Sequence, residues 1–168
     1  MVQTFDNVFD GMTLTKVLDT VNSSNWYFGH GSYDPNDPRR GFPFWRMDLK
    51  QYKFFNTYLL NIIQEKTQQE YELYDVYANG HTFGTAGDLH VDWYDDRGRT
   101  FLFYAIDDWK LQWGGKTVFE LGDGEYHYQL PKPNTAVLFP GNMRHAAEAV
   151  TRSFAGLRIT IAWKLLVK

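Results

Sequence analysis

Two histidines and one aspartate in this chain have the residue types and spacing of a metal site. His90-Val91-Asp92 is followed further along the chain by His145. Residues two apart in a strand point to the same side, so His90 and Asp92 can present their ligand atoms together while Val91 faces away. His145 follows the turn Pro140-Gly141-Asn142, which places it at the mouth of a neighbouring strand. Two histidines and a carboxylate form the facial triad that holds non-haem Fe(II) and leaves positions open for a co-substrate and oxygen.

A second pattern downstream could bind an anion. Arg158 and Thr160 share one face of the apolar segment from Leu157 to Trp163. A guanidinium takes a carboxylate in bidentate fashion, and a neighbouring hydroxyl can donate one more bond. Tyr104 could add a phenolic donor. These residues alone leave open an internal salt bridge for Arg158 and an ordinary core position for Tyr104.

The residues also leave two other classes of function open. The first is a zinc-dependent hydrolase, because two histidines and a carboxylate also build catalytic zinc sites. Such a hydrolase needs a general base near the metal, and Glu148 is expected on the opposite strand face from His145. The second is a non-catalytic jelly-roll binding module, which has no need of the triad together with Arg158.

Composition narrows the class of protein. The 168 residues predict a single domain, 1–168. A net charge of −3 argues against a nucleic-acid partner, which would favour a basic face. The absence of cysteine excludes disulfides, thiolate-zinc sites and a cysteine nucleophile. No apolar run has membrane-spanning length and the first residues do not read as a signal peptide, so we expect no membrane association and a cytosolic location.

The hydrophobic pattern predicts helices first and strands afterwards. Met12–Val21 and Tyr52–Gln64 have helical spacing, and Tyr27–Pro43, with Arg39 and Arg40, has the composition of a long loop that could act as a lid. From residue 71 the apolar period becomes two, and 18% aromatic residues favour strands. The expected strands are Tyr71–Ala78, Leu89–Trp93, Thr100–Ile106, Thr117–Leu121, Glu125–Leu130, Thr135–Phe139, Arg144–Val150 and Gly156–Leu166. These elements predict a mainly β fold, a sandwich or closed double sheet over about 71–168. Helices within about 1–70 are expected to cover one outer face of it.

Several segments then resemble one known family, the 2-oxoglutarate- and Fe(II)-dependent dioxygenases, in their prolyl-4-hydroxylase-like branch. The resemblance runs from Tyr77 to Lys164, about half the chain. It rests on Tyr77–Gly84, His90-Val91-Asp92, Thr100–Tyr104, Trp113–Phe119, Pro131–Asn134, Phe139–Asn142 before His145, and Arg158-Ile159-Thr160. It implies a double-stranded β-helix (jelly-roll) core with Fe(II) on His90, Asp92 and His145. It also implies that the far carboxylate of 2-oxoglutarate binds Arg158, assisted by Thr160 and Tyr104.

The same resemblance implies hydroxylation of a peptidyl proline or a small molecule, with release of succinate and carbon dioxide. It suggests ascorbate as an additional cofactor. Halogenating relatives lack the carboxylate ligand, so the presence of Asp92 favours hydroxylation. The segment between His145 and Arg158 is slightly longer than in the better-known prolyl hydroxylases, which makes Arg152 a competing candidate for the carboxylate contact. Arg158 is preferred because of its strand context and Thr160.

Overall fold

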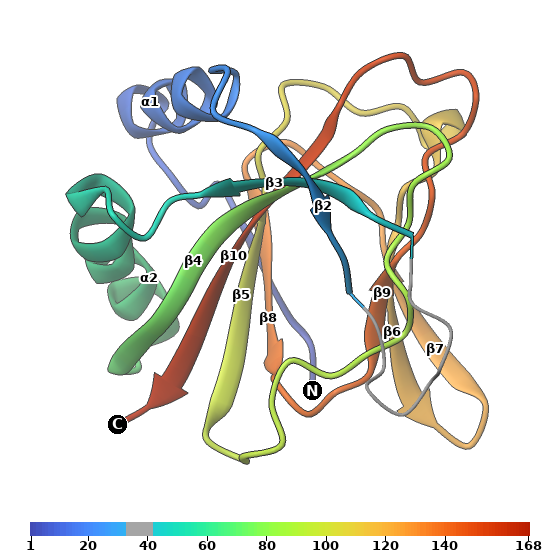
Figure 1. The fold of residues 1–168 in the computed structure, drawn as a ribbon. Helices are drawn as coiled ribbons and strands as arrows, with labels where there is room; N and C mark the ends of the chain where they lie inside the picture. Colours follow the sequence, from blue (N-terminus) through green and yellow to red (C-terminus); the bar gives the residue numbers. More distant parts are fainter. Residues whose placement is uncertain (33–41) are drawn as a thin grey trace.

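Two antiparallel sheets face one another in the computed structural model, which describes residues 1–32 and 42–168 (Figure 1). The larger sheet has seven strands in the order β1-β8-β5-β10-β4-β3-β2, and the smaller has three in the order β7-β6-β9. The strands are β1 Gln3–Asp6, β2 Tyr27–His30, β3 Phe44–Asp48, β4 Tyr71–His81, β5 Gly98–Tyr104, β6 Thr117–Gly122, β7 Glu125–Gln129, β8 Thr135–Pro140, β9 His145–Ala147 and β10 Arg158–Val167.

The helices cover the outer face of the larger sheet, as expected (Figure 1). Helix α1 (Gly11–Val21) begins where the Asp10 carboxylate accepts a bond from the Thr13 amide at 2.9 Å, an N-cap that satisfies one of the free amides of the first turn. Helix α2 (Leu60–Thr67) continues a π-helical segment, Phe54–Leu59, and ends at Gln68 in a left-handed conformation. Both helices bury apolar side chains against the sheet, and the indole of Trp163 donates to the Phe55 carbonyl at 3.0 Å.

Strand β10 shows how the sheet separates a core from a site. Its residues Ile159, Ile161, Trp163 and Leu165 pack into the hydrophobic core under the helices. The alternate residues point the other way, toward the smaller sheet. These are Arg158, Thr160, Ala162 and Lys164, and all four line one pocket between the sheets.

Most predicted elements are confirmed, with shifted ends, and three predictions need correction. Leu89–Trp93 is not a strand: His90 makes a single bridge to His145, and the rest of the segment is irregular. The strand expected over Arg144–Val150 is only His145–Ala147. The loop expected over Tyr27–Pro43 begins with β2, which pairs with β3, while Arg39 and Arg40 lie outside the described residues.

The first 70 residues supply strands as well as helices, since β1, β2 and β3 all join the larger sheet. The short strands β1 and β2 form the two edges of that sheet. Within the described ranges, none of the helices is both long and apolar enough to cross a membrane.

Candidate metal centre and co-substrate pocket

The three predicted metal ligands converge between the two sheets. His90 and His145 exchange backbone hydrogen bonds at 3.0 and 2.9 Å, and the Asp92 amide donates to the Gly141 carbonyl at 2.8 Å. These bonds fix the 90–92 segment against the turn between β8 and β9. One ligand atom from each of the three residues lies within 4.8 Å of the other two. His90 Nε2 is 3.4 Å from Asp92 Oδ1, and His145 Nε2 is 3.5 Å from Asp92 Oδ2.

Hydrogen bonds on the far side of each imidazole set the tautomer that a metal requires. His90 Nδ1 donates to the Asp88 carbonyl at 2.7 Å, and His145 Nδ1 donates to the Met143 carbonyl at 3.0 Å. A carbonyl only accepts, so each Nδ1 carries the proton and each Nε2 keeps its lone pair. Burial lowers the pKa of His145 to about 4, so that this ring is neutral at physiological pH. The donor set therefore fits a divalent iron of the facial-triad type.

Asp92 is a buried carboxylate held by two side chains. Thr100 Oγ1 donates to its Oδ2 at 2.5 Å, and the Lys164 ammonium pairs with the same oxygen. Burial alone would raise the pKa of Asp92, but Lys164 and the two histidines hold it well below its usual range. The ionised form that a metal needs is therefore the stable one.

Arg158 is buried at the other end of the site. Its side chain is 1% exposed, Nε donates to the Gly115 carbonyl at 2.6 Å, and an Nη donates to Thr117 Oγ1 at 3.1 Å. In the described part of the chain no carboxylate lies within ion-pair distance of it, so the internal salt bridge left open by the sequence is not present there. Burial lowers its pKa, yet a guanidinium remains a cation near neutral pH.

We call the space between Arg158 and the triad the inner pocket. Arg158, Thr160, Thr117, His90 and His145 all line it. Tyr104 contributes indirectly: it is buried, and its hydroxyl shares a 2.8 Å hydrogen bond with Thr117, which in turn accepts from Arg158. Arg152 lies in an exposed turn and is not among the lining residues.

Thr117, His81, Asn79 and Lys164 are four of the lining residues that sequence reasoning did not assign to the site. Lys164 could have been found, because it continues the two-residue period of Arg158 and Thr160 along β10. The other three have no such signal, since their place depends on how β4 and β6 pack around the pocket.

The comparison with family models decides the family. A model described as the 2OG-Fe(II) oxygenase superfamily matches residues 74–163. This chain belongs to that superfamily. The 2-oxoglutarate- and Fe(II)-dependent dioxygenase predicted from the sequence is thus confirmed as an enzyme class, with the substrate unidentified. The superfamily match favours the oxygenase over the zinc hydrolase and the binding module.

Solved structures confirm the jelly-roll fold. An oxidoreductase of the 2OG-Fe(II) oxygenase family from Burkholderia pseudomallei superposes with a TM-score of 0.74 at 13% identity, covering 98% of this chain and 84% of the other. A Trichoplax adhaerens prolyl hydroxylase, in complex with a hypoxia inducible factor peptide, gives 0.71 at 14% identity, covering 98% and 83%. The viral collagen prolyl hydroxylase of Paramecium Bursaria Chlorella virus-1 gives 0.65 at 16%, covering 99% and 96%. No curated protein matches by sequence.

Proposed function

We propose that this oxygenase holds Fe(II) on His90, Asp92 and His145 and binds 2-oxoglutarate in the inner pocket, with its far carboxylate on Arg158. The observation that carries the proposal is a buried guanidinium with no carboxylate within ion-pair distance among the described residues, in the pocket that is also lined by His90 and His145 of the converged triad. An unpaired buried charge is strongly unfavourable, so the pocket favours a dianion that can reach both Arg158 and a metal ion on the triad.

When bound, iron and 2-oxoglutarate would supply the oxidative chemistry with dioxygen as the oxidant: one oxygen atom enters succinate as the co-substrate loses carbon dioxide, and the other becomes the hydroxyl group of the product. The protein supplies positions and shielding. Arg158 binds the far carboxylate, and Thr117 and Tyr104 hold Arg158 in place. Thr160, 2% exposed, offers a hydroxyl to the same carboxylate. Thr100 and Lys164 hold Asp92 ionised.

The primary substrate belongs to one of two classes, a peptidyl proline or a small molecule. The Trichoplax neighbour binds a peptide, which supports the first class by fold analogy alone. Ascorbate as an additional cofactor and a cytosolic location remain predictions from the sequence.

The test is an anaerobic titration of Fe(II)-loaded protein with 2-oxoglutarate, following the visible metal-to-ligand charge-transfer band. We expect a saturable band in the parent protein, none in Asp92→Ala, and a band in Arg158→Ala only at much higher 2-oxoglutarate concentration. Arg152→Ala is the matched control and should titrate like the parent. If no band forms with iron demonstrably bound, or if Arg152→Ala rather than Arg158→Ala weakens it, the assignment is wrong.

A further inference from the structure

The segment that carries Asp92 belongs to no strand, so other contacts must hold this ligand in place. The backbone bridge between His90 and His145 ties the two histidine ligands directly to each other. Asp92 lies beyond that bridge. The Gly141 carbonyl accepts the amides of Asp92 and Trp93 at 2.8 and 3.0 Å. The position of the carboxylate relative to the histidines therefore depends on what holds this part of the chain against Gly141.

The side chain of Trp93 lies in a notch formed by two buried glycines. Gly98 begins β5, and Gly141 lies in the turn between β8 and β9. The two are joined by a hydrogen bond of 2.9 Å from the Gly141 amide to the Gly98 carbonyl. A Cβ added at Gly98 would lie 2.6 Å from Cβ of Trp93, and one added at Gly141 would lie 2.8 Å from the same atom. Only the missing side chains of these glycines leave room for Trp93.

The backbone itself does not require glycine at either position. Neither Gly98 nor Gly141 has a positive φ, so the conformation of the chain would accept alanine. An alanine would instead meet Trp93 at Cβ and Cγ, which are at the base of its side chain. A rotation of the indole cannot move Cβ away. The main chain of Trp93 would have to shift, and that of the adjacent Asp92 with it.

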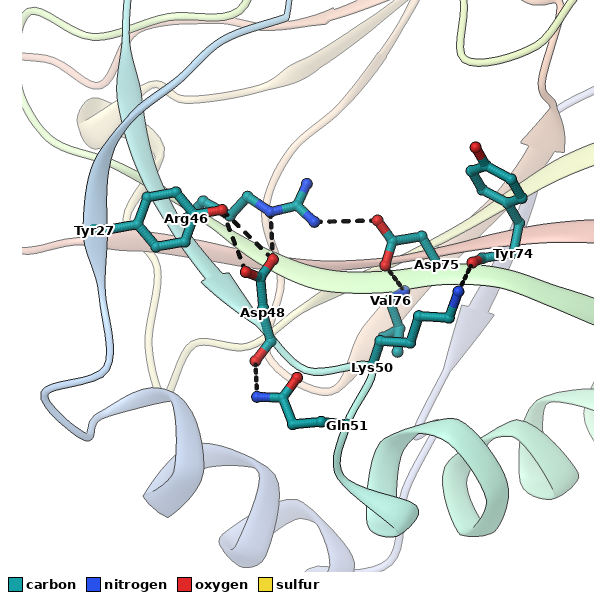
Figure 2. Close-up of polar contacts among 8 residues, drawn as sticks. All are labelled: Tyr27, Arg46, Asp48, Lys50, Gln51, Tyr74, Asp75 and Val76. Carbon is teal, nitrogen blue, oxygen red and sulfur yellow. Dashed lines mark hydrogen bonds and ion pairs between the residues drawn. The ribbon is translucent and has the colours of Figure 1, made fainter.

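Packing rather than hydrogen bonding holds the indole. Its Nε1 is buried and has no hydrogen-bond partner among the described residues. Its ring meets the ring of Tyr74 edge to face, with 4.8 Å between centroids. Figure 2 shows Tyr74 on β4, where Lys50 donates to its carbonyl at 2.5 Å. Trp93 is half-buried and lies outside both clusters of the hydrophobic core, so its packing stabilises the segment around Asp92 rather than the core.

We propose that Trp93 is a positioning residue for the metal ligand Asp92, and that it acts by filling the notch between Gly98 and Gly141. This step rests on the proposed function, in which Asp92 binds Fe(II). With the indole in the notch, the neighbouring carboxylate is held where it meets the two histidines. Without it, only the backbone bonds to Gly141 remain to place Asp92. Loss of the ring should therefore weaken metal binding.

The test measures Fe(II) affinity by anaerobic competition with a fluorescent chelator. Groups that orient a metal ligand typically contribute about 10- to 100-fold in affinity, and we expect losses of this size in Trp93→Ala and in Gly141→Ala. Trp93→Phe keeps a ring in the notch and loses no hydrogen bond, so it should bind Fe(II) like the parent. Gly80→Ala is the matched control: this glycine is also buried and has no positive φ, but its added Cβ would lie 2.9 Å from Leu157 instead of Trp93.

The absorption spectrum of the Co(II)-loaded proteins separates a positioning role from a general loss of stability. Its ligand-field bands depend on which groups bind the metal. We expect the spectrum of Trp93→Ala to shift toward that of Asp92→Ala. A variant that is destabilised only in its fold, as expected for Gly80→Ala, should keep the parent spectrum.

The outcomes also distinguish this inference from the proposed function. If Asp92→Ala binds Fe(II) as tightly as the parent, the proposed function fails. If Asp92→Ala weakens binding but Trp93→Ala does not, or if Trp93→Ala keeps the parent Co(II) spectrum, the inference about Trp93 is overturned. It is also overturned if Trp93→Phe loses as much affinity as Trp93→Ala, or if Gly80→Ala loses as much as Gly141→Ala, since filling of the notch would then not be what positions Asp92.

Discussion

Arg158 lies directly opposite His81 in the antiparallel register of β10 and β4, so the two side chains emerge next to each other on the inner face of the larger sheet. Both are buried, at 1% and 2% exposure. Arg158 has hydrogen-bond partners, but within the described residues neither ring nitrogen of His81 has one, and nor does Oδ1 of Asn79. Buried polar groups are nearly always paired. These three atoms therefore indicate that a polar ligand completes the inner pocket.

We predict that His81→Phe weakens 2-oxoglutarate binding without destabilising the ligand-free protein. The imidazole lies 4.3 Å from the Phe44 ring, so another aromatic ring fits the same stack, and no protein hydrogen bond is lost. Loss of one hydrogen bond to a charged ligand costs about 1.5–3 kcal/mol, or roughly 10- to 150-fold in affinity. Charge-transfer titration and urea unfolding measure the two effects. Unchanged affinity with lower stability would assign His81 to the core instead.

The same variant should flatten the dependence of stability on pH. Burial, with Arg158 next, lowers the pKa of His81 to about 3, whereas an unfolded histidine titrates near 6.5. As pH falls below 6.5 the unfolded chain takes up a proton that the folded protein does not, so stability present at neutral pH is lost on acidification. Between pH 7.5 and 5.0 that loss is about 2 kcal/mol for one such group.

Urea unfolding of the metal-free parent and His81→Phe at pH 7.5 and 5.0 checks this prediction. The other buried histidines contribute in the same direction to both proteins, so only the difference between the two slopes reports His81. An equal loss of stability in both proteins would show that His81 does not titrate in this way.

Gly115 is a position where an added methyl group would reach Arg158, the residue proposed to bind the co-substrate. It has a φ of +66°, and an added Cβ would lie 2.9 Å from Cδ of Arg158 and 3.0 Å from Val150. We predict that Gly115→Ala displaces Arg158 and weakens 2-oxoglutarate binding at least tenfold, besides a strain of about 1–2 kcal/mol in unfolding free energy. Gly84→Ala is the matched control, because Gly84 has a φ of +85° and no heavy atom within 4 Å of the added Cβ. If both variants bind 2-oxoglutarate equally, contact with Arg158 is not what Gly115 protects.

The sequence predicted the strands that carry the site better than the segment that carries the triad. The two-residue period of β10 placed Arg158 and Thr160 on one face, and the structure has them there. His90 and Asp92 were expected together because of a strand that does not exist. They meet His145 instead through backbone bonds to that residue and to Gly141. Such long-range pairing of an irregular segment leaves no periodic signal.

Strands β2 and β3 and the residues of the pocket wall could not be predicted from the sequence, for a related reason. Strands β2 and β3 have only four and five residues, too few for a clear two-residue apolar period, and β2 is mostly exposed. Nothing in the sequence around His81 distinguishes it from other histidines in strands. Its place in the pocket follows only from its pairing with Arg158 on the neighbouring strand. Tyr104 was predicted to assist the carboxylate contact of Arg158; its hydroxyl is hydrogen-bonded to Thr117, so we predict that it assists through that residue.

Thr100 should affect the affinity for the metal ion through its hydrogen bond to Asp92. Its hydroxyl donates to Asp92 Oδ2 at 2.5 Å, the oxygen that Lys164 also contacts, and so fixes how the carboxylate faces the histidines. Removing a hydrogen bond that orients a metal ligand typically lowers metal affinity about 10- to 100-fold. We expect Thr100→Val to lower the affinity for Fe(II) about tenfold, because Lys164 still holds the carboxylate.

Thr135→Val is the matched control: Thr135 is equally buried, but its hydroxyl donates to Asp6 at 3.1 Å. Anaerobic competition with a fluorescent chelator should show weaker Fe(II) binding in the first variant only, and equal affinities would mean that Lys164 alone orients Asp92.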